Sequence, residues 1–464
     1  MIIAVVGAGG KTSLIKELAA QYRAEEKKVF VTTSTHTFIE EHTLCTDDAE
    51  CILGELGEKG FVMAGIQEGE KIKSLSRETY EKVCGHADVV LVEADGSKHM
   101  PFKYPDETEP VIPENADEIF VVCGLHGIGK KAKDCCHRLE LVKCCLGIED
   151  DTLITPSHVQ QLLEKGYLKP LREKYPEKKI TIVPRHDGSL YQRSIAALMQ
   201  QEKDVSVMKR EWFCPQPRLI ICGGGHVAKE VAAMASHLDF PVRIIDERED
   251  LMTQERFSYS EEVICDSYDN IEKYLEPGAY YVVVTPNHKA DYSCVSAILS
   301  TEYSYLGMIG SKRKVAETKE RLQADGFSEE QINSIFAPIG LSINAVTPAE
   351  IAISILAQII QEKNKSHAAS ADRDLLKASE KGVLCVIVEK HGSSPRGAGS
   401  MMFVGEDKIL GSIGGGEAEY LAITHARETT EITEREYGLN NKRADGLDMV
   451  CGGRIKVLFI PVFL

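Results

Sequence analysis

The sequence predicts an α/β protein with two domains built on parallel sheets and a smaller α+β domain at the C-terminus. Continuous apolar strands alternate with helices as far as about residue 365, which is typical of parallel sheets covered on both faces. The remainder is richer in strands and glycine turns. Because the 464 residues exceed one ordinary core of about 150 residues, we expect three domains, over residues 1–205, 216–365 and 371–464.

The first segment opens with the apolar strand IIAVV, a glycine turn and an apolar-periodic helix that begins at Lys11. Further strands are predicted in the stretches KKVFVTTST, ADVVLVEADG, EIFVVCG and KKITIVP. A composition break follows at KREWFCPQPR, where two prolines flank Gln216 just before a new strand. We therefore end the first domain before this break.

The glycine turn GAGGKT predicts a phosphate site, because a strand that ends in glycines aims backbone N–H groups and a helix N-terminus at one anion. Its predicted binding residues are Gly7, Gly9, Gly10, Lys11 and Thr12. Lys11 adds a point charge, and Thr12 adds a hydroxyl for magnesium. Since Val5 stands six positions before Lys11, only the shortened, P-loop-like pattern G-x-x-G-K-T of Mur-ligase-like ATPases remains. We expect ATP or another nucleoside triphosphate with magnesium; the alternative is a turn that only caps the helix.

Two carboxylates stand at the end of the predicted strand VVLVE. Glu93 and Asp95 are candidates to hold magnesium or to position water beside the phosphate loop, and Thr12 and Glu93 are the candidate metal ligands. An Asp-Gly turn is the structural alternative for Asp95, but it does not explain Glu93. The hydroxyl-rich end of the stretch VFVTTSTHTF adds His36 as a weaker candidate.

The second segment carries a Rossmann fingerprint between a strand and a helix. The pattern G-x-G-x-x-A begins at Gly223, and an acidic residue ends the next strand about twenty residues later. We expect a Rossmann domain that binds a dinucleotide or a related ligand. The candidate binding residues are Gly223, Gly225, His226, Asp246 and His288.

Two loops of the third segment are candidate anion sites formed by backbone N–H groups. They contain the sequences GSSPR and GGGE, and the candidate residues are Ser394, Arg396, Gly414, Gly415, Gly416 and Glu417. Cys451 lies in MVCGG, where the glycines leave room for a bulky ligand. It is interpreted with equal weight as a packed thiol and as a catalytic thiol that handles a soft atom, activated by Arg396.

Charge and cysteine content narrow the classes of partner. The net charge of −17 does not favour binding to nucleic acid or to an anionic membrane. No apolar run is long enough to span a bilayer. We expect a cytoplasmic protein in which most of the 14 cysteines are reduced. If KDCCHRLELVKCCLG is one helix, its cysteine pairs, Cys135–Cys136 and Cys144–Cys145, lie roughly 13 Å apart, too far for one zinc ion.

The motifs of the second and third segments resemble the XdhC/CoxI family of molybdenum-hydroxylase accessory proteins over about residues 218–464. The resemblance rests on CGGGHVA, VVVTPNHKADY, YLGMIGSKRK, GSSPRGAGSMM, GSIGGGEAE and MVCGG. The first segment, with VGAGGKTSLI, TTSTH and EADGSKHMPFK, resembles the YqeC-type accessory proteins of selenium-dependent molybdenum hydroxylases. In the usual family order the domain with GSSPR precedes the Rossmann domain, whereas here it follows.

The resemblance implies a cytoplasmic maturation factor. Such a protein binds the molybdenum pyranopterin cofactor, including its dinucleotide form, during sulfuration or selenation by a cysteine desulfurase or a selenium donor protein. It then delivers the cofactor to an apo molybdenum hydroxylase, and the first loop holds a nucleotide that drives or gates the process. A homodimer is a further expectation. Two alternatives remain: an NAD(P)-dependent oxidoreductase that uses Gly223, Gly225 and Asp246, and a nucleotidyltransferase that acts on the pterin cofactor.

Overall fold

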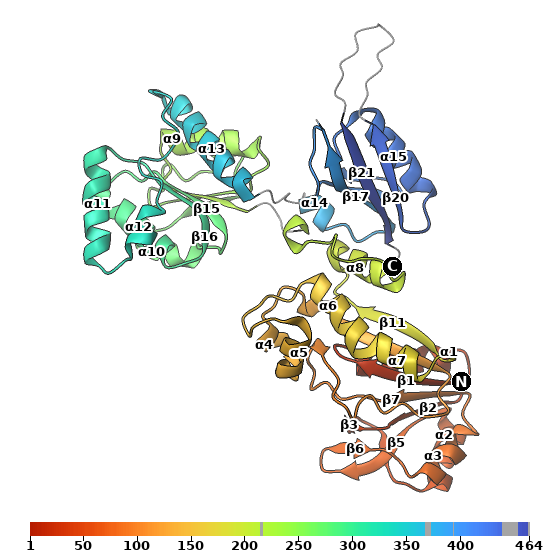
Figure 1. Ribbon diagram of the computed structural model, residues 1–464. Coiled ribbons are helices and arrows are strands. Elements are labelled where there is room, and N and C mark those ends of the chain that lie inside the picture. The colour runs from red at the N-terminus through yellow and green to blue at the C-terminus, as the bar shows by residue number, and fades with distance from the viewer. Residues whose placement is uncertain (214–216, 367–372, 393, 439–452, 463–464) are drawn as a thin grey trace. The chain divides into compact units, whose positions relative to one another are not determined.

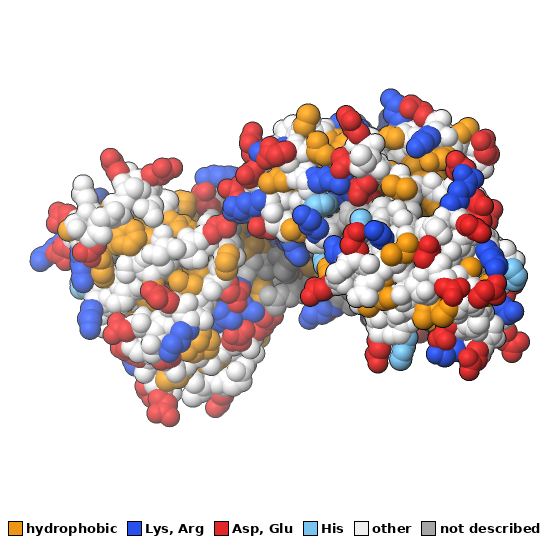
Figure 2. Space-filling model, turned by 90° about the horizontal axis from the view of Figure 1, so that it is seen from below, with side chains coloured by type: hydrophobic (Ala, Val, Ile, Leu, Met, Phe, Trp, Pro, Cys, Tyr) orange, Lys and Arg blue, Asp and Glu red, His pale blue; other side chains and the backbone are white. Residues whose placement is uncertain are grey.

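The computed structural model describes residues 1–213, 217–366, 373–392, 394–438 and 453–462. Their contacts define two compact units, Met1–Phe213 with Asp374–Leu464, and Cys214–Arg373 (Figure 1). Within these ranges every helix is too short or too polar to cross a membrane. Figure 2 shows acidic and basic side chains interspersed over the face in view.

A nine-stranded sheet organises the N-terminal part of the first unit, with strand order β11-β9-β1-β7-β2-β5-β6-β3 and β4 paired to β5. Its neighbours are parallel except for β5–β6 and β3–β6. The strands are β1 (Ile2–Gly7), β2 (Val29–Thr33), β3 (His36–Phe38), β4 (Thr43–Cys45), β5 (Phe61–Glu68), β6 (Lys71–Lys73), β7 (Val89–Glu93), β9 (Glu118–Gly124) and β11 (Lys179–Arg185).

Helices cover both faces of this sheet, as predicted from its apolar strands. Helix α1 (Lys11–Ala24) packs on one face, where Leu14 and Ile15 contact a core that includes Ile3 and Val31. Helices α2 (Ala49–Lys59) and α3 (Arg77–Cys84) cover the other face around Phe30. The carboxyl ends of the adjacent parallel strands β1, β7 and β2 therefore meet at one edge, where ligands bind in open α/β sheets.

The stretch KDCCHRLELVKCCLG is not one helix. Helix α4 (Ala132–Cys135) ends at the first cysteine pair, and β10 (Cys136–His137) then pairs with β8 (Phe102–Lys103). Arg138 has a φ of 57° and precedes α5 (Leu139–Leu146), so the chain changes direction between the two cysteine pairs. The remaining helices of this part are α6 (Pro156–Leu163), α7 (Lys169–Lys174) and α8 (Leu190–Gln200).

The second unit is a five-stranded, fully parallel Rossmann sheet with strand order β14-β13-β12-β15-β16. Helices α9 and α13 share one core with it, and α10 and α11 share the other. In the sequence, Thr347, Pro348 and Glu350 are typical of a capping box at a helix start, and in the structure Thr347 and Glu350 cap α13 reciprocally. The elements are β12 (Leu219–Cys222), α9 (His226–Ser236), β13 (Val242–Asp246), β14 (Glu262–Cys265), β15 (Ala279–Val283), α10 (His288–Leu299), β16 (Tyr303–Met308), α11 (Lys312–Ala324), α12 (Glu329–Asn333) and α13 (Pro348–Lys363).

The C-terminal part of the first unit is an antiparallel sheet of order β19-β18-β17-β21-β20, which gives the predicted α+β class. Helix α15 packs on it, and Arg193 of α8 donates hydrogen bonds to the carbonyls of Ala378 (2.8 Å) and Glu380 (3.1 Å). The elements are α14 (Arg373–Leu376), β17 (Gly382–His391), β18 (Met401–Gly405), β19 (Ile409–Gly411), α15 (Gly416–Glu428), β20 (Thr433–Gly438) and β21 (Arg454–Val462).

Candidate functional site

The turn after β1 has a backbone that only glycine adopts easily. Gly7, Gly9 and Gly10 have φ values of 95°, 76° and 130°. A Cβ on Gly7 would lie 2.1 Å from the carbonyl oxygen of Val122, and one on Gly9 would lie 2.6 Å from Cα of Gly124. The turn is therefore pressed against the end of β9, and its glycines are structurally required.

This turn leaves helix α1 with unsatisfied donors. The N–H of Gly7 donates to Asp95 Oδ2 (3.0 Å), and that of Ala8 donates to the carbonyl of Val122 (2.9 Å). Gly10 caps α1 without a side-chain hydrogen bond, and the first turn of the helix contains no acidic residue. Because the first N–H groups of a helix lack partners within it, this end suits an anion.

Lys11 is folded back over the turn. Its side chain is almost fully buried, and Nζ donates to the carbonyl of Gly7 (2.8 Å) and to Ser97 Oγ (3.0 Å). Glu93 Oε1 lies 3.8 Å from the same nitrogen. Burial lowers the pKa of Lys11, with the nearby carboxylates opposing this effect. The carboxylate of Glu93 is 3.8 Å from the Lys11 amine, and a bound phosphate could place a negative charge closer to it.

Glu93 and Thr12, the predicted metal ligands, line the same small cavity of about 50 Å³, together with Glu40. Glu93 Oε2 accepts a hydrogen bond from the hydroxyl of Thr37 (2.9 Å), and burial raises the pKa of Glu93. Oxygen donors of this kind suit magnesium, which also takes phosphate and water oxygens. Among the described residues no group of three or more His, Cys, Asp and Glu side chains is arranged to hold a metal ion.

Asp95 ties the turn to a buried ionic network. It is 0% exposed, accepts from the hydroxyl of Tyr167 (2.7 Å) as well as from Gly7, and pairs with Lys103. Lys103 in turn pairs with Glu109. Burial raises the pKa of Asp95, against the lowering effect of Lys103. The geometry therefore gives Asp95 the position of a residue that orients the turn.

Sequence reasoning missed these partners of Asp95. Lys103 closes the stretch EADGSKHMPFK, so its presence beside two acids was a usable signal. Tyr167 comes from the segment between α6 and α7, and no local pattern marks it. Arg138, whose Nη1 donates to Glu109 Oε2 (2.6 Å), lies in the stretch KDCCHRLELVKCCLG, but sequence reasoning gave it no role.

The Rossmann turn uses its aspartate internally. Gly223 has a φ of 124°, and a Cβ there would lie 2.4 Å from the carbonyl oxygen of Val284. Asp246, 0% exposed, accepts from the N–H of Gly224 (2.6 Å) and from the backbone and guanidinium of Arg248. Burial opposes its ionisation, but these bonds outweigh it and lower the pKa of Asp246 to about 2. Both carboxylate oxygens therefore face the protein's own donors.

The other predicted residues of the second unit lie at the same edge of the sheet. Gly225 caps α9, and a Cβ there would meet open space; His226 begins that helix. His288 begins α10 after the short loop that follows β15, and it is exposed. Its neighbour Asp291 is buried, accepts from the hydroxyl of Thr285 (2.6 Å) and pairs with Lys314 of α11. His226 and His288 are thus accessible side chains at this edge, whereas Asp291 links two helices.

In the C-terminal part the two predicted loops meet. A Cβ on Gly414 would lie 3.6 Å from Cγ of Arg396, which is exposed, and Ser394 Oγ donates to the carbonyl of Arg396 (2.8 Å). The N–H groups around the glycines point at Glu419, whose Oε2 accepts from Ile413 (2.9 Å) and Gly415 (3.0 Å). The backbone nest is filled by this internal carboxylate, which sequence reasoning missed.

Gly415 contributes only its backbone N–H to that contact, and Gly416 and Glu417 have no hydrogen bond in it. Gly415 and Gly416 have open space where a Cβ would stand, and Glu417 is exposed in the first turn of α15. Cys451, the predicted thiol, lies outside the described residues.

Three protein families match successive parts of the chain. They are described as the YqeC protein, which matches residues 3–140, the XdhC Rossmann domain, which matches residues 219–359, and the XdhC and CoxI family, which matches residues 375–438. These ranges include the GAGGKT turn, the Gly223 turn and the loops around Arg396 and Gly414.

Individual relatives each match part of the chain. The uncharacterized protein YqeC of Escherichia coli (strain K12) is 34% identical over 169 residues, or 35% of this chain and 64% of that protein. The uncharacterized protein YqeB of the same strain is 32% identical over 32% of this chain and 28% of its own length. A protein of Bacillus subtilis (strain 168), described as a probable xanthine dehydrogenase subunit, is 26% identical over 51% of this chain and 65% of its own length.

Among solved structures, a crystal structure described as a xanthine dehydrogenase from Bacillus halodurans is 30% identical, with a TM-score of 0.30. The match covers 32% of this chain and 44% of that one. The family matches thus divide the chain into a region that matches the YqeC family, residues 3–140, and two regions that match the XdhC Rossmann domain and the XdhC and CoxI family, residues 219–359 and 375–438.

Proposed function

We propose that this protein is a maturation factor for a molybdenum hydroxylase and binds the molybdenum pyranopterin cofactor as its cargo. The observation that carries the proposal is that both XdhC-family domains occur in one chain with a YqeC domain. The relative described as a probable xanthine dehydrogenase subunit supports this class of client. The cargo would receive sulfur or selenium from a donor protein while bound and then pass to the apo-hydroxylase.

The GAGGKT turn is the proposed nucleotide site. The unsatisfied donors at the start of α1 would bind the phosphates, and Lys11 would move from the carbonyl of Gly7 to a phosphate oxygen. Thr12 and Glu93 would hold magnesium, which neutralises phosphate charge when bound. Asp95 would keep the turn in shape through the N–H of Gly7. Nucleotide binding at this turn is proposed to gate maturation.

Each XdhC-family domain is proposed to offer its own exposed residues to the cargo. Arg396 stands beside the Gly414 turn and suits a phosphate of the cofactor, while His226 and His288 are accessible at the Rossmann edge. Asp246 is occupied by Gly224 and Arg248, which leaves it poorly placed to bind the ribose of NAD(P). This favours cargo binding over the oxidoreductase alternative.

The test is to purify the protein from cells grown with molybdate and to measure molybdenum by mass spectrometry and pterin by its fluorescent oxidation product. We expect roughly stoichiometric amounts of both, and about a tenfold loss in Arg396→Ala. The matched control is Arg427→Ala, an exposed arginine of α15 in the same domain. Wild-type protein that carries neither molybdenum nor pterin, with an apo-hydroxylase co-expressed or absent, would refute the proposal.

Cys451 is proposed to handle the sulfur or selenium atom. The test is Cys451→Ser co-expressed with a client hydroxylase. We expect client protein that contains molybdenum but is inactive because it lacks the chalcogen ligand. Fully active client would contradict this role.

A further inference from the structure

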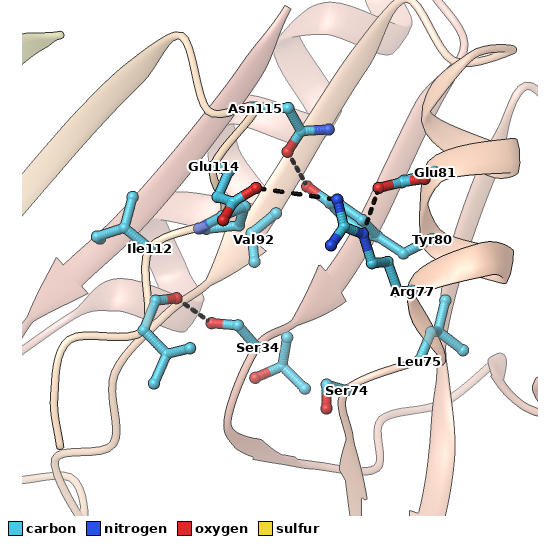
Figure 3. A pocket seen from close by; sticks show the side chains of 13 residues that line it. Ser34, Ser74, Leu75, Arg77, Tyr80, Glu81, Val92, Ile112, Glu114 and Asn115 are labelled. Atoms are coloured by element: carbon cyan, nitrogen blue, oxygen red, sulfur yellow. Dashed lines mark hydrogen bonds and ion pairs between the residues drawn. The ribbon is translucent and has the colours of Figure 1, made fainter.

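The N-terminal domain contains a cavity that the functions proposed above do not use. Its volume is about 650 Å³, within the range of small-molecule sites of roughly 300–1,000 Å³. It lies between helix α3 and the segment 111–115, on the face of the sheet opposite α1 (Figure 3).

The inner wall of this cavity is apolar and suits a flat ring. Leu75, Val92 and Ile112 supply aliphatic surface from three separate segments. The hydroxyl of Tyr80 donates to Asn115 Oδ1 (3.1 Å), and burial raises the pKa of Tyr80, so the phenol stays protonated and keeps Asn115 oriented. With its oxygen held by Tyr80, Asn115 keeps its amide nitrogen as a donor for a ligand carbonyl.

The mouth of the cavity carries two carboxylates and one cation. Arg77 Nε donates to Glu81 Oε1 (2.7 Å), and its Nη2 lies 3.9 Å from Glu114 Oε2 (Figure 3). The net negative charge disfavours an anionic group here. A carboxylate has two oxygens that accept parallel N–H bonds, so this mouth favours a ligand edge with two adjacent N–H donors.

The cavity adjoins the GAGGKT turn through one residue. Thr33 and Ser34, which line the cavity at the end of β2, donate from the hydroxyl (2.8 Å) and from the backbone N–H (3.1 Å) to the carbonyl of Glu93. The side chain of Glu93 lies 3.8 Å from Lys11 Nζ. A ligand in the cavity is thus separated from the proposed nucleotide site by the end of β7.

We infer that this cavity binds a planar nitrogen heterocycle with an amino group beside a ring N–H, the edge that a pterin and a guanine base share. The ring packs against Leu75, Val92 and Ile112, its N–H edge donates to Glu81 or Glu114, and its carbonyl accepts from Asn115. The inference that a heterocycle binds here is argued from the residues that line the cavity alone. Its role as a second substrate beside the nucleotide rests on the proposed function.

The experiment titrates the full chain with pterin, followed by the probe's own fluorescence, and with guanosine and adenosine, followed by calorimetry. These probes carry no phosphate, so they test the cavity without the GAGGKT turn. Adenosine has an amino group but no adjacent ring N–H. The variants are Asn115→Ala and Ser74→Trp, which places a large side chain at an exposed position of the lining. The matched control is Glu78→Ala, an exposed residue of α3 that does not line the cavity.

We expect saturable binding of pterin or guanosine, with adenosine about tenfold weaker. Either cavity variant should weaken this binding about tenfold or more, and Glu78→Ala should leave it unchanged. Preference for pterin or for guanosine identifies the source of the ring. The inference would be overturned if neither pterin nor guanosine shows saturable binding, or if adenosine binds as tightly as they do. It would also be overturned if neither cavity variant changes their affinity. ATP binding that persists in Ser74→Trp shows that the variant is folded. If wild-type protein binds pterin or guanosine but not ATP, the proposed nucleotide site is refuted and the cavity inference stays intact.

Discussion

The turn after β1 and the turn after β12 share a backbone plan but differ in the charges around them. Each follows a strand inside a parallel sheet, and each is held by a buried aspartate at the end of a neighbouring strand. Asp95 accepts from Gly7 at 3.0 Å, and Asp246 accepts from Gly224 at 2.6 Å. In both cases the carboxylate holds the turn.

The difference lies in the cations. Asp95 pairs with Lys103, which is 0% exposed, and leaves Lys11 over the turn, whereas Asp246 pairs with Arg248, whose side chain is 37% exposed. The helix after the second turn begins with His226 and has no lysine at that position. A glycine turn thus provides the backbone for an anion, and the flanking side chains decide whether a strongly charged phosphate is favoured there.

We expect the largest effect from Asp95→Asn. Because this variant breaks the buried ion pair with Lys103, it should lower the free energy of unfolding of the first unit by roughly 3–5 kcal/mol. Urea unfolding followed by the fluorescence of the single tryptophan, Trp212, reports on this unit. The matched control is Asp151→Asn, an exposed partner of Lys133, with an expected loss below about 1 kcal/mol. Equal urea midpoints for the two variants would mean that the pair does not stabilise the turn.

The next effect is on ligand binding at the first turn. Lys11→Ala should weaken ATP binding with magnesium about 100-fold, or about 2.7 kcal/mol, because it removes the only lysine that contacts the turn among the described residues. Calorimetry with ATP, GTP and CTP measures this. Lys16→Ala, on the same helix but 62% exposed and paired with Glu40, is the control and should bind normally. If the wild-type protein binds none of the three nucleotides, the first turn does not differ from the second in its preference for a phosphate.

A smaller, pH-dependent effect is expected at Asp246. Its pKa of about 2 in the folded state lies below the ordinary value of about 3.9, so its ionised form stabilises the second unit by about 2 kcal/mol above pH ~4. This contribution is lost as the pH falls through the folded pKa. Asp246→Asn should therefore accelerate hydrogen exchange in residues 219–246 at pH 7, with a gap to wild type that narrows below pH ~4. A gap that stays constant down to pH 3 would contradict the assignment.

The smallest effect is expected for Gly225→Ala. Gly225 has a φ of −72° and open space at its Cβ position, so the change should cost less than about 1 kcal/mol of unfolding free energy. Gly9→Ala is the opposing control, because its φ is 76° and its Cβ would meet backbone at 2.6 Å. Thermal unfolding of both variants checks this. If Gly225→Ala proves as damaging as Gly9→Ala, the second turn is as tightly packed as the first.

Much of the fold was predictable because its signals are local. The apolar strands predicted the sheets, and the residues Thr347, Pro348 and Glu350 predicted the start of α13, since a capping box is closed within four residues. The positions of both glycine turns followed from the same short-range patterns. The premise of one helix across both cysteine pairs failed because Arg138 takes a left-handed conformation and pairs with Asp106 and Glu109, which lie far from it in sequence.

The sequence by itself determined where the strands, turns and candidate charged residues stand along the chain, because backbone propensity and capping act over a few residues. Only the tertiary structure decided which of them face one another. Tyr167 reaches Asp95 across 72 positions, and Glu419 rather than a ligand fills the nest at Gly415. Packing brings such groups together, and a buried carboxylate then takes whichever donors lie nearest because leaving it unpaired costs several kcal/mol.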